Sequence, residues 1–166
     1  MNVVLVEPEI PPNTGNVARL CAATKTTLHL VEPLGFELSD KMLKRAGMDY
    51  WNQVDWKCWP SFQALRASFP ESRFYFIETG TAQVYSEIRF QPNDFIVFGR
   101  ETKGLPLPLI EANREHCYQI PMLNPDSRSL NLANCVAIVL YEALRQQNFG
   151  SVVNSNSSIA SRRPVR

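Results

Sequence analysis

The sequence of 166 residues lacks several features that would assign a protein to a class at once. None of its four cysteines belongs to a CxxC pair, and its two histidines, His29 and His116, are far apart. Because metal sites need clustered ligands, we expect no metal. No apolar run is long enough to span a bilayer, and no basic leader precedes an apolar segment at the N-terminus. We therefore expect a cytoplasmic protein that does not enter a membrane.

Strong charge and familiar catalytic motifs are also missing. The net charge is +1, and the segment after Gly150 holds three arginines and no acid, so residues 1–150 carry −2. Such a body would bind nucleic acid only through a local basic patch. The sequence has no GxGxxG or GKS/GKT loop, and no evident Ser–His–Asp set, Cys–His set or carboxylate pair. These absences argue against a dinucleotide-dependent oxidoreductase, a nucleoside-phosphate cradle and a hydrolase with a nucleophile or paired acids.

What the chain does contain is an alternation of short apolar runs and helical patterns. Strands are predicted at 3–6, 28–31, 74–77, 95–98 and 118–120. Helices are predicted at about 16–23, 40–46, 62–68, 107–113 and 130–147. This order predicts a single α/β domain over residues 1–150, in which helices flank a mostly parallel sheet. Residues 151–166, rich in Ser, Asn and Arg, are expected to form a disordered basic tail.

Four loops deserve inspection because ligands of open parallel sheets bind beyond the carboxyl ends of the strands. They are residues 8–16, 78–82, 99–106 and 121–130, and all are rich in Gly, Pro, Asn, Thr or Ser. In the first loop, Asn13 or Thr14 is expected to cap a helix. In the last, Ser127 or Ser129 is expected to do so. A single cap does not account for the seven hydrogen-bonding side chains that precede the buried amphipathic helix there.

Of the four loops, residues 99–106 in the segment FIVFGRETKGLP give the stronger indication of a binding site. Gly99 directly ends a predicted strand, and Gly104 follows five residues later. Glycines in these places are expected to let main-chain N–H and C=O groups approach a ligand closely. Glu101 and Thr102 add hydrogen-bond acceptors, and the neighbouring arginine and lysine add positive charge. The pattern is compatible with reading a nucleoside through main-chain hydrogen bonds.

Three segments together resemble the SPOUT class of RNA methyltransferases: PPNTGNVARL (11–20), FGRETKGLP (98–106), and IPM with SRSLNLANCVAIVLYEALRQ (120–146). The similarity covers about residues 1–149 and is greatest to the small branch that 2′-O-methylates the wobble nucleotide, position 34, of tRNA. This resemblance implies a deep C-terminal trefoil knot and a homodimer. It also implies S-adenosylmethionine (AdoMet) as methyl donor, S-adenosylhomocysteine as product, and the anticodon loop of tRNA, with cytidine or a modified uridine, as partner. Knots are nearly absent from other folds, so periodicity alone would not suggest one.

The resemblance also assigns roles to individual residues. It places the cofactor against one set: Ile77, Thr79, Gly99, Glu101, Ile120, Met122, Ser129 and Leu130. It assigns Arg19, with Asn16 before it, to the reacting ribose. Because free arginine stays protonated, we favour phosphate anchoring and orientation by Arg19, and proton removal stays open.

The candidates for RNA contact are basic or aromatic: Lys41, Lys44, Arg45, Arg128 and Tyr141. A solvated helix face explains the cluster at 41–45 equally well. Stacking on bases is one role for a group of four aromatic residues, Tyr50, Trp51, Trp56 and Trp59. We favour the other role, which is aromatic cover of the core.

Two features depart from the family pattern. Ala133 stands where many relatives have Ser, and the loop 121–128 is one residue longer than in some relatives, so no role is carried over to residues 124–127. One alternative is a methyltransferase of the same class with another RNA target, either ribosomal RNA or another tRNA position. The other is a non-catalytic RNA-binding protein that has kept the knot. Five intact residues argue against loss of catalysis: Asn16, Arg19, Gly99, Gly104 and Ser129.

Overall fold

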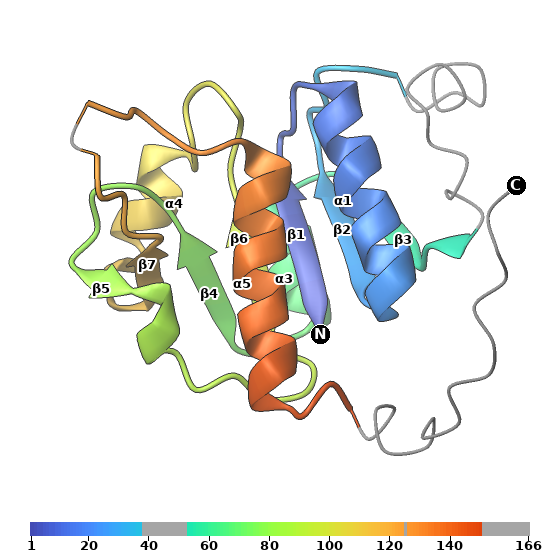
Figure 1. The fold of residues 1–166 in the computed structure, drawn as a ribbon. Coiled ribbons are helices and arrows are strands. Elements are labelled where there is room, and N and C mark those ends of the chain that lie inside the picture. Colours follow the sequence, from blue (N-terminus) through green and yellow to red (C-terminus); the bar gives the residue numbers. More distant parts are fainter. Residues whose placement is uncertain (38–52, 125, 151–166) are drawn as a thin grey trace, which may run out of the picture.

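The computed structural model describes residues 1–37, 53–124 and 126–150. Its centre is a sheet of seven strands in the order β3-β2-β1-β6-β4-β7-β5, and every pair of neighbours is parallel (Figure 1). The strands are β1 (Asn2–Val6), β2 (Thr27–Val31), β3 (Trp56–Trp59), β4 (Phe74–Ile77), β5 (Gln83–Val84), β6 (Phe95–Phe98) and β7 (Cys117–Gln119). This sheet confirms the predicted α/β fold.

Helices cover both faces of the sheet (Figure 1). On one face α1 (Pro11–Thr24) and α5 (Leu132–Gln146) pack against each other. On the other face lie α3 (Phe62–Ser68) and α4 (Leu107–Glu111). Two 3-10 turns, η2 (Tyr85–Glu87) and η3 (Arg114–His116), complete the described elements. No helix in this described part is both long enough and apolar enough to span a membrane.

Two hydrophobic cores follow from the two-residue repeat of a strand. In β1, Val3 and Leu5 belong to the core beneath α1 and α5, whereas Val4 and Val6 belong to the core beneath α3 and α4. The runs FYFI and FIVF of β4 and β6 are buried throughout, as expected for central parallel strands. The sheet is therefore a fixed platform for the loops at its edges.

The predicted strands are confirmed, the last with a shift of one residue, but β3 and β5 were missed. The run WKCW of β3 is partly exposed because it lies at the edge of the sheet, so it lacks the apolar pattern of a central strand. Trp56 packs against one core and Trp59 against the other, which confirms that these two residues cover the core. The helix predicted at 40–46, Tyr50, Trp51 and the tail 151–166 lie outside the described residues.

The predicted helix starts were wrong in two places. The first helix begins at Pro11 rather than near residue 16, because prolines suit the first helical positions. Its N-cap residue is Ile10, while Asn13 and Thr14 are buried within the helix and do not cap it. The last helix begins at Leu132 and is capped by Asn131 instead of by a serine. Helix α4 ends at Glu111, two residues earlier than predicted.

Candidate cofactor pocket and active site

The register of the sheet brings four loops to one edge. Leu5 is paired with Phe98, Phe98 with Ile77, and Ile77 with Tyr118. Strands β1, β6, β4 and β7 therefore end at nearly the same level. The loops that follow them meet at the carboxyl edge, where open parallel sheets bind ligands.

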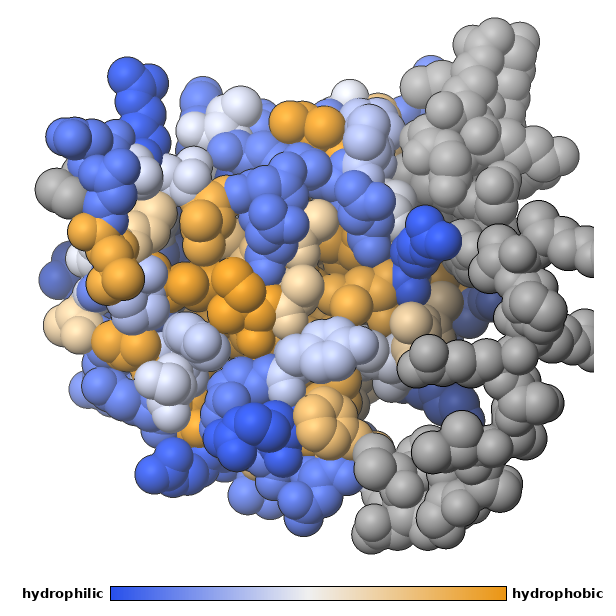
Figure 2. All heavy atoms as spheres, in the orientation of Figure 1, coloured by the Kyte–Doolittle hydropathy of each residue, from blue (hydrophilic) through white to orange (hydrophobic). Residues whose placement is uncertain are grey.

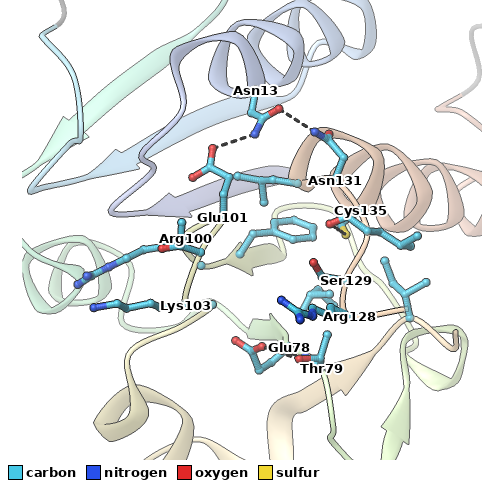
Figure 3. Close-up of a pocket in the computed structure, with 18 of the residues that line it drawn as sticks. Asn13, Glu78, Thr79, Arg100, Glu101, Lys103, Arg128, Ser129, Asn131 and Cys135 are labelled. Carbon is cyan, nitrogen blue, oxygen red and sulfur yellow. Dashed lines mark hydrogen bonds between the residues drawn. The ribbon is translucent and has the colours of Figure 1, made fainter. Parts of the chain in front are cut away.

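A cavity of about 550 Å³ lies among these loops (Figure 3). Its lining includes all eight residues that the resemblance assigned to the cofactor: Ile77, Thr79, Gly99, Glu101, Ile120, Met122, Ser129 and Leu130. They end or follow three different strands, β4, β6 and β7, or lead into α5. Ile77, Ile120 and Leu130 supply apolar walls, and the segments around Gly99 and Ser129 supply polar groups. Apolar walls with a few placed polar groups are the usual make-up of a small-molecule site.

Gly99 and Gly104 shape one wall of this cavity through close contact between backbones. The main-chain N–H and C=O groups of Arg100 and Gly104 bond to each other in both directions, at 3.0 Å each. A Cβ atom on Gly99 would lie 2.1 Å from the carbonyl carbon of Gly104, and one on Gly104 would lie 2.3 Å from Oε2 of Glu78. Gly104 also has a φ of +67°, which favours glycine. Besides lining the cavity, Gly99 thus leaves room for the backbone of Gly104, and Gly104 leaves room for the carboxylate of Glu78, which the sequence did not indicate.

Three side chains of the lining are joined by hydrogen bonds (Figure 3). Asn13 Nδ2 donates to Glu101 Oε1 at 3.1 Å, and Asn131 Nδ2 donates to Asn13 Oδ1 at 2.9 Å. Glu101 also accepts two main-chain N–H groups from the segment just before α1. Asn131 Oδ1 accepts N–H groups of the first turn of α5 and so caps that helix. This chain of bonds ties the starts of α1 and α5 to the loop after β6.

Asn13, Asn131 and Glu78 line the cavity although the sequence analysis did not assign them to the cofactor. Glu78 accepts main-chain N–H groups from Thr79 at 2.9 Å and from Leu105 at 2.7 Å, which holds the loop after β6 against the end of β4. Both asparagines lie inside the motifs of the resemblance, and Asn131 also belongs to the polar cluster that precedes the last helix. They are 118 residues apart in sequence, so no local pattern pairs them.

The charged groups of the cavity differ in how they are bound. Its described lining holds three cations and two acids: Arg100, Lys103, Arg128, Glu78 and Glu101. Arg100 forms an ion pair with Glu7.

Cys135 also borders the cavity, and burial raises the pKa of its thiol, so it is a neutral part of the wall. Among the described residues, no group of three or more His, Cys, Asp or Glu side chains is placed to hold a metal ion.

The residues assigned to the reacting ribose lie away from the cavity of their own chain. Asn16 and Arg19 are exposed on α1, three residues apart and therefore on one helix face. Neither belongs to the described residues that line the cavity. Asn13, one turn earlier on the same helix, does line it. One chain alone therefore does not bring Arg19 into the cofactor cavity.

The RNA-binding candidates fall into three groups. Arg128 lines the cavity. Tyr141 lies on the exposed side of α5, where its ring stands 6.4 Å from that of Phe149, measured between centroids. The third group, Lys41, Lys44 and Arg45, lies outside the described residues.

Comparison with known proteins now decides the family. A model of the SpoU rRNA Methylase family matches residues 1–141. The chain belongs to this family. The SpoU fold implies a trefoil knot, and the predicted SPOUT resemblance is confirmed.

Several SpoU relatives share most of the length of this chain. A protein from Aeromonas hydrophila named tRNA (cytidine(34)-2′-O)-methyltransferase is 47% identical over 150 residues, which cover 90% of this chain and 96% of the relative. A solved structure described as "Structural insights into the 2-OH methylation of C/U34 on tRNA" is 44% identical, with a TM-score of 0.82 over 89% of this chain and 95% of that one.

A more distant SpoU structure bears on the cofactor. AviRb from Streptomyces viridochromogenes, solved in complex with AdoMet, is 23% identical, with a TM-score of 0.74 over 90% of this chain and 61% of that one. At this identity the likeness shows a shared fold. SpoU homologues of this chain thus bind AdoMet.

Proposed function

We propose that this SpoU chain transfers a methyl group from AdoMet to the ribose 2′-hydroxyl of nucleotide 34, a cytidine or a modified uridine, in the anticodon loop of tRNA. The observation that carries the proposal is the convergence of all eight expected cofactor residues on one cavity. Relatives that match nearly the whole chain at 44% and 47% identity are described by this position and this reaction.

The cavity suits AdoMet in size and in chemistry. Its volume of about 550 Å³ falls inside the range of roughly 300–1,000 Å³ that is usual for small-molecule sites. Ile77, Ile120 and Leu130 offer apolar surface to an adenine ring, and the main chain beside Gly99 offers polar partners to its edge. Bound there, AdoMet supplies an activated methyl group on a positively charged sulfur.

The contribution of the chain's own residues is mainly positioning. Methyl transfer is an in-line displacement, and holding the two reacting atoms in line can supply a large part of the acceleration. A guanidinium offers N–H donors and no acceptor, so Arg19 anchors and orients the phosphate or ribose of the target nucleotide. Asn16 stands on the same helix face and adds an amide beside it.

We also propose that the active unit is a homodimer joined through the face of α1 and α5. Arg19 lies on this face and outside the cavity of its own chain, so a second copy is needed to bring an arginine to each cavity. The same face carries a band of apolar residues across its middle (Figure 2). On α5, Ile138 and Tyr141 are 37% and 49% exposed, and Leu144 is partly buried beside them. Pairing with another copy would bury this apolar surface.

In this proposal residues 1–150 act as one methyltransferase domain in the cytoplasm, where the enzyme meets tRNA. The anticodon loop would contact residues beside the cavity or on the shared face: Lys41, Lys44, Arg45, Arg128 and Tyr141.

One experiment tests the proposed reaction directly. The purified protein is incubated with total tRNA and AdoMet labelled in the methyl group, and the labelled RNA is digested and mapped. We expect the label on the 2′-oxygen of nucleotide 34. Label at another position, or on ribosomal RNA alone, would support the alternative target. If calorimetry found no AdoMet binding at millimolar concentration, the non-catalytic RNA-binding protein would be favoured.

A further inference from the structure

The side chain of Arg128 points into the cavity of its own chain. It stands directly before Ser129, and its guanidinium points toward the middle of the cavity in Figure 3. Arg100 and Lys103 run side by side away from that centre in the same view. Arg100 is held in its ion pair with Glu7. Of the described cations in the lining, Arg128 alone points into the cavity.

The acids of the cavity are bound by other groups. Both oxygens of Glu101 accept hydrogen bonds, from the Asn13 amide and from two main-chain N–H groups before α1. Both oxygens of Glu78 accept hydrogen bonds from the backbone, and one of them also accepts from the Thr79 hydroxyl. Within the described residues neither acid bonds to Arg128. Its guanidinium therefore keeps its fork of five N–H donors for a ligand.

We propose that Arg128 is a positioning residue that binds an oxyanion brought into the cavity by a substrate. A guanidinium matches the paired oxygens of a carboxylate or a phosphate through two parallel hydrogen bonds. Arg128 is exposed on the lining of the cavity, where a substrate can reach it. This inference rests on the proposed function, which supplies two sources of the oxyanion. AdoMet carries one carboxylate on its amino-acid end, and tRNA carries a phosphate on each side of the target ribose.

The test measures the affinity of three probes by calorimetry: AdoMet, 5′-methylthioadenosine, which lacks the amino-acid end, and tRNA. The variants are Arg128→Ala, Arg128→Lys and, as the matched control, Lys103→Ala. The control also removes one positive charge from the lining, but from a side chain that points outward. We expect Arg128→Ala to raise the Kd of an oxyanion-bearing probe about ten- to a hundredfold. Lys103→Ala should change it by no more than about threefold.

Each outcome has a defined meaning. If Arg128→Ala loses affinity for AdoMet but not for methylthioadenosine, the oxyanion is the cofactor carboxylate. If it loses affinity for tRNA but not for AdoMet, the oxyanion is an RNA phosphate. A loss for both AdoMet and tRNA, with methylthioadenosine unchanged, supports the proposal for both sources. Partial recovery by Arg128→Lys is expected, because lysine keeps the charge without the fork.

Two results would overturn the proposal. One is an effect of Arg128→Ala no larger than that of Lys103→Ala. The other is an equal loss for methylthioadenosine, which would mean that the cavity itself had been damaged. The proposed function fails in a different way, if the unaltered protein binds no AdoMet or methylates no tRNA.

Discussion

At the scale of single residues, two glycines with positive φ differ in what surrounds them. Gly80 has a φ of +73° and nothing within 4 Å of the place where a Cβ would stand. Gly104 has a φ of +67°, and its Cβ would meet the carboxylate of Glu78. Replacement by alanine therefore strains only the backbone at Gly80. At Gly104 it strains the backbone and also makes a steric clash with Glu78.

We predict that Gly104→Ala lowers the free energy of unfolding by about 3 kcal/mol or more, because it adds a steric clash to the cost of its φ angle. Gly80→Ala, the matched control, should cost about 1–2 kcal/mol, from the φ angle alone. Urea unfolding followed by circular dichroism measures both values. Equal losses in the two variants would show that Glu78 moves aside without cost.

His29 is a buried group whose charge the fold suppresses. Its side chain is fully buried, and its ring lies among aromatic residues. Trp59 Nε1–H donates to Nδ1 at 3.0 Å, so the ring proton belongs on Nε2, which is 3.1 Å from Asn2 Oδ1. Burial first, and the nearby Lys57 second, lower the pKa of His29 from 6.5 to about 4, against an opposing effect of Asp55. The folded protein therefore holds a neutral imidazole.

This pKa predicts a dependence of stability on pH. A group whose folded pKa is lowered binds more protons when unfolded, so its contribution is complete above pH 6.5 and falls as the pH drops toward 4. We expect protonation of His29 in the unfolded chain to lower the free energy of unfolding by about 3 kcal/mol at pH 4. Urea unfolding between pH 7.5 and pH 4 measures how the free energy of unfolding depends on pH. This dependence should be weaker for His29→Gln, whose side chain cannot be protonated. His116→Gln, at an exposed position, should keep the slope of the unaltered protein.

At the scale of elements, the site depends on where two helices begin. Within the described structure no side chain caps α1, and the carboxylate of Glu101 accepts N–H groups just before its first turn instead. Asn131 caps α5 and also bonds to Asn13 of α1. The starts of both helices are thus held by side chains that line the cofactor cavity.

We predict that Asn131→Ala lowers the free energy of unfolding by about 1–2 kcal/mol, because it removes the cap of α5. Asn131→Asp keeps a capping oxygen but loses the N–H that bonds to Asn13. It should therefore retain most of the stability while it weakens AdoMet binding severalfold, as unfolding and calorimetry would show. If the two variants had the same stability, the cap would not be the stabilising element.

At the scale of the whole molecule, the proposed active site needs two chains. Arg19 is exposed on α1 and lies outside the described lining of its own cavity. Arg19→Ala is therefore expected to abolish tRNA methylation and to leave the Kd for AdoMet within about twofold, since it removes no contact to the cofactor. Near-normal turnover of this variant would contradict the role assigned to Arg19.

Mixed dimers test whether the site is shared between subunits. Ile120→Trp should fill the cavity and prevent AdoMet binding, so this variant and Arg19→Ala should each be inactive alone. In a coexpressed mixture, half of the dimers combine the two chains and hold one intact composite site, so about a quarter of normal activity should return. A mixture as inactive as its components would mean that each chain uses its own Arg19.

Much of the fold could be predicted from the sequence because its signals are local. The apolar runs of β1, β2, β4 and β6 identify buried strands, and the helical spacing of residues 132–144 identifies α5. The edge strands β3 and β5 lack that apolar pattern, so no local signal indicated them. The caps were misplaced because several hydrogen-bonding residues precede each helix, and contacts with distant segments choose among them.

The sequence by itself determined the α/β class and, through the predicted strand ends and three motifs, the loops and residues that line the cavity. Only the tertiary structure decided how those loops meet. It placed Asn13 against Asn131, Glu78 beside Gly104, and Arg19 at an exposed position outside the lining of the cavity. The physical reason is that apolar periodicity is set by near neighbours in the chain. Hydrogen bonds between loops depend instead on the strand order and register of the sheet, which bring distant segments to the same edge.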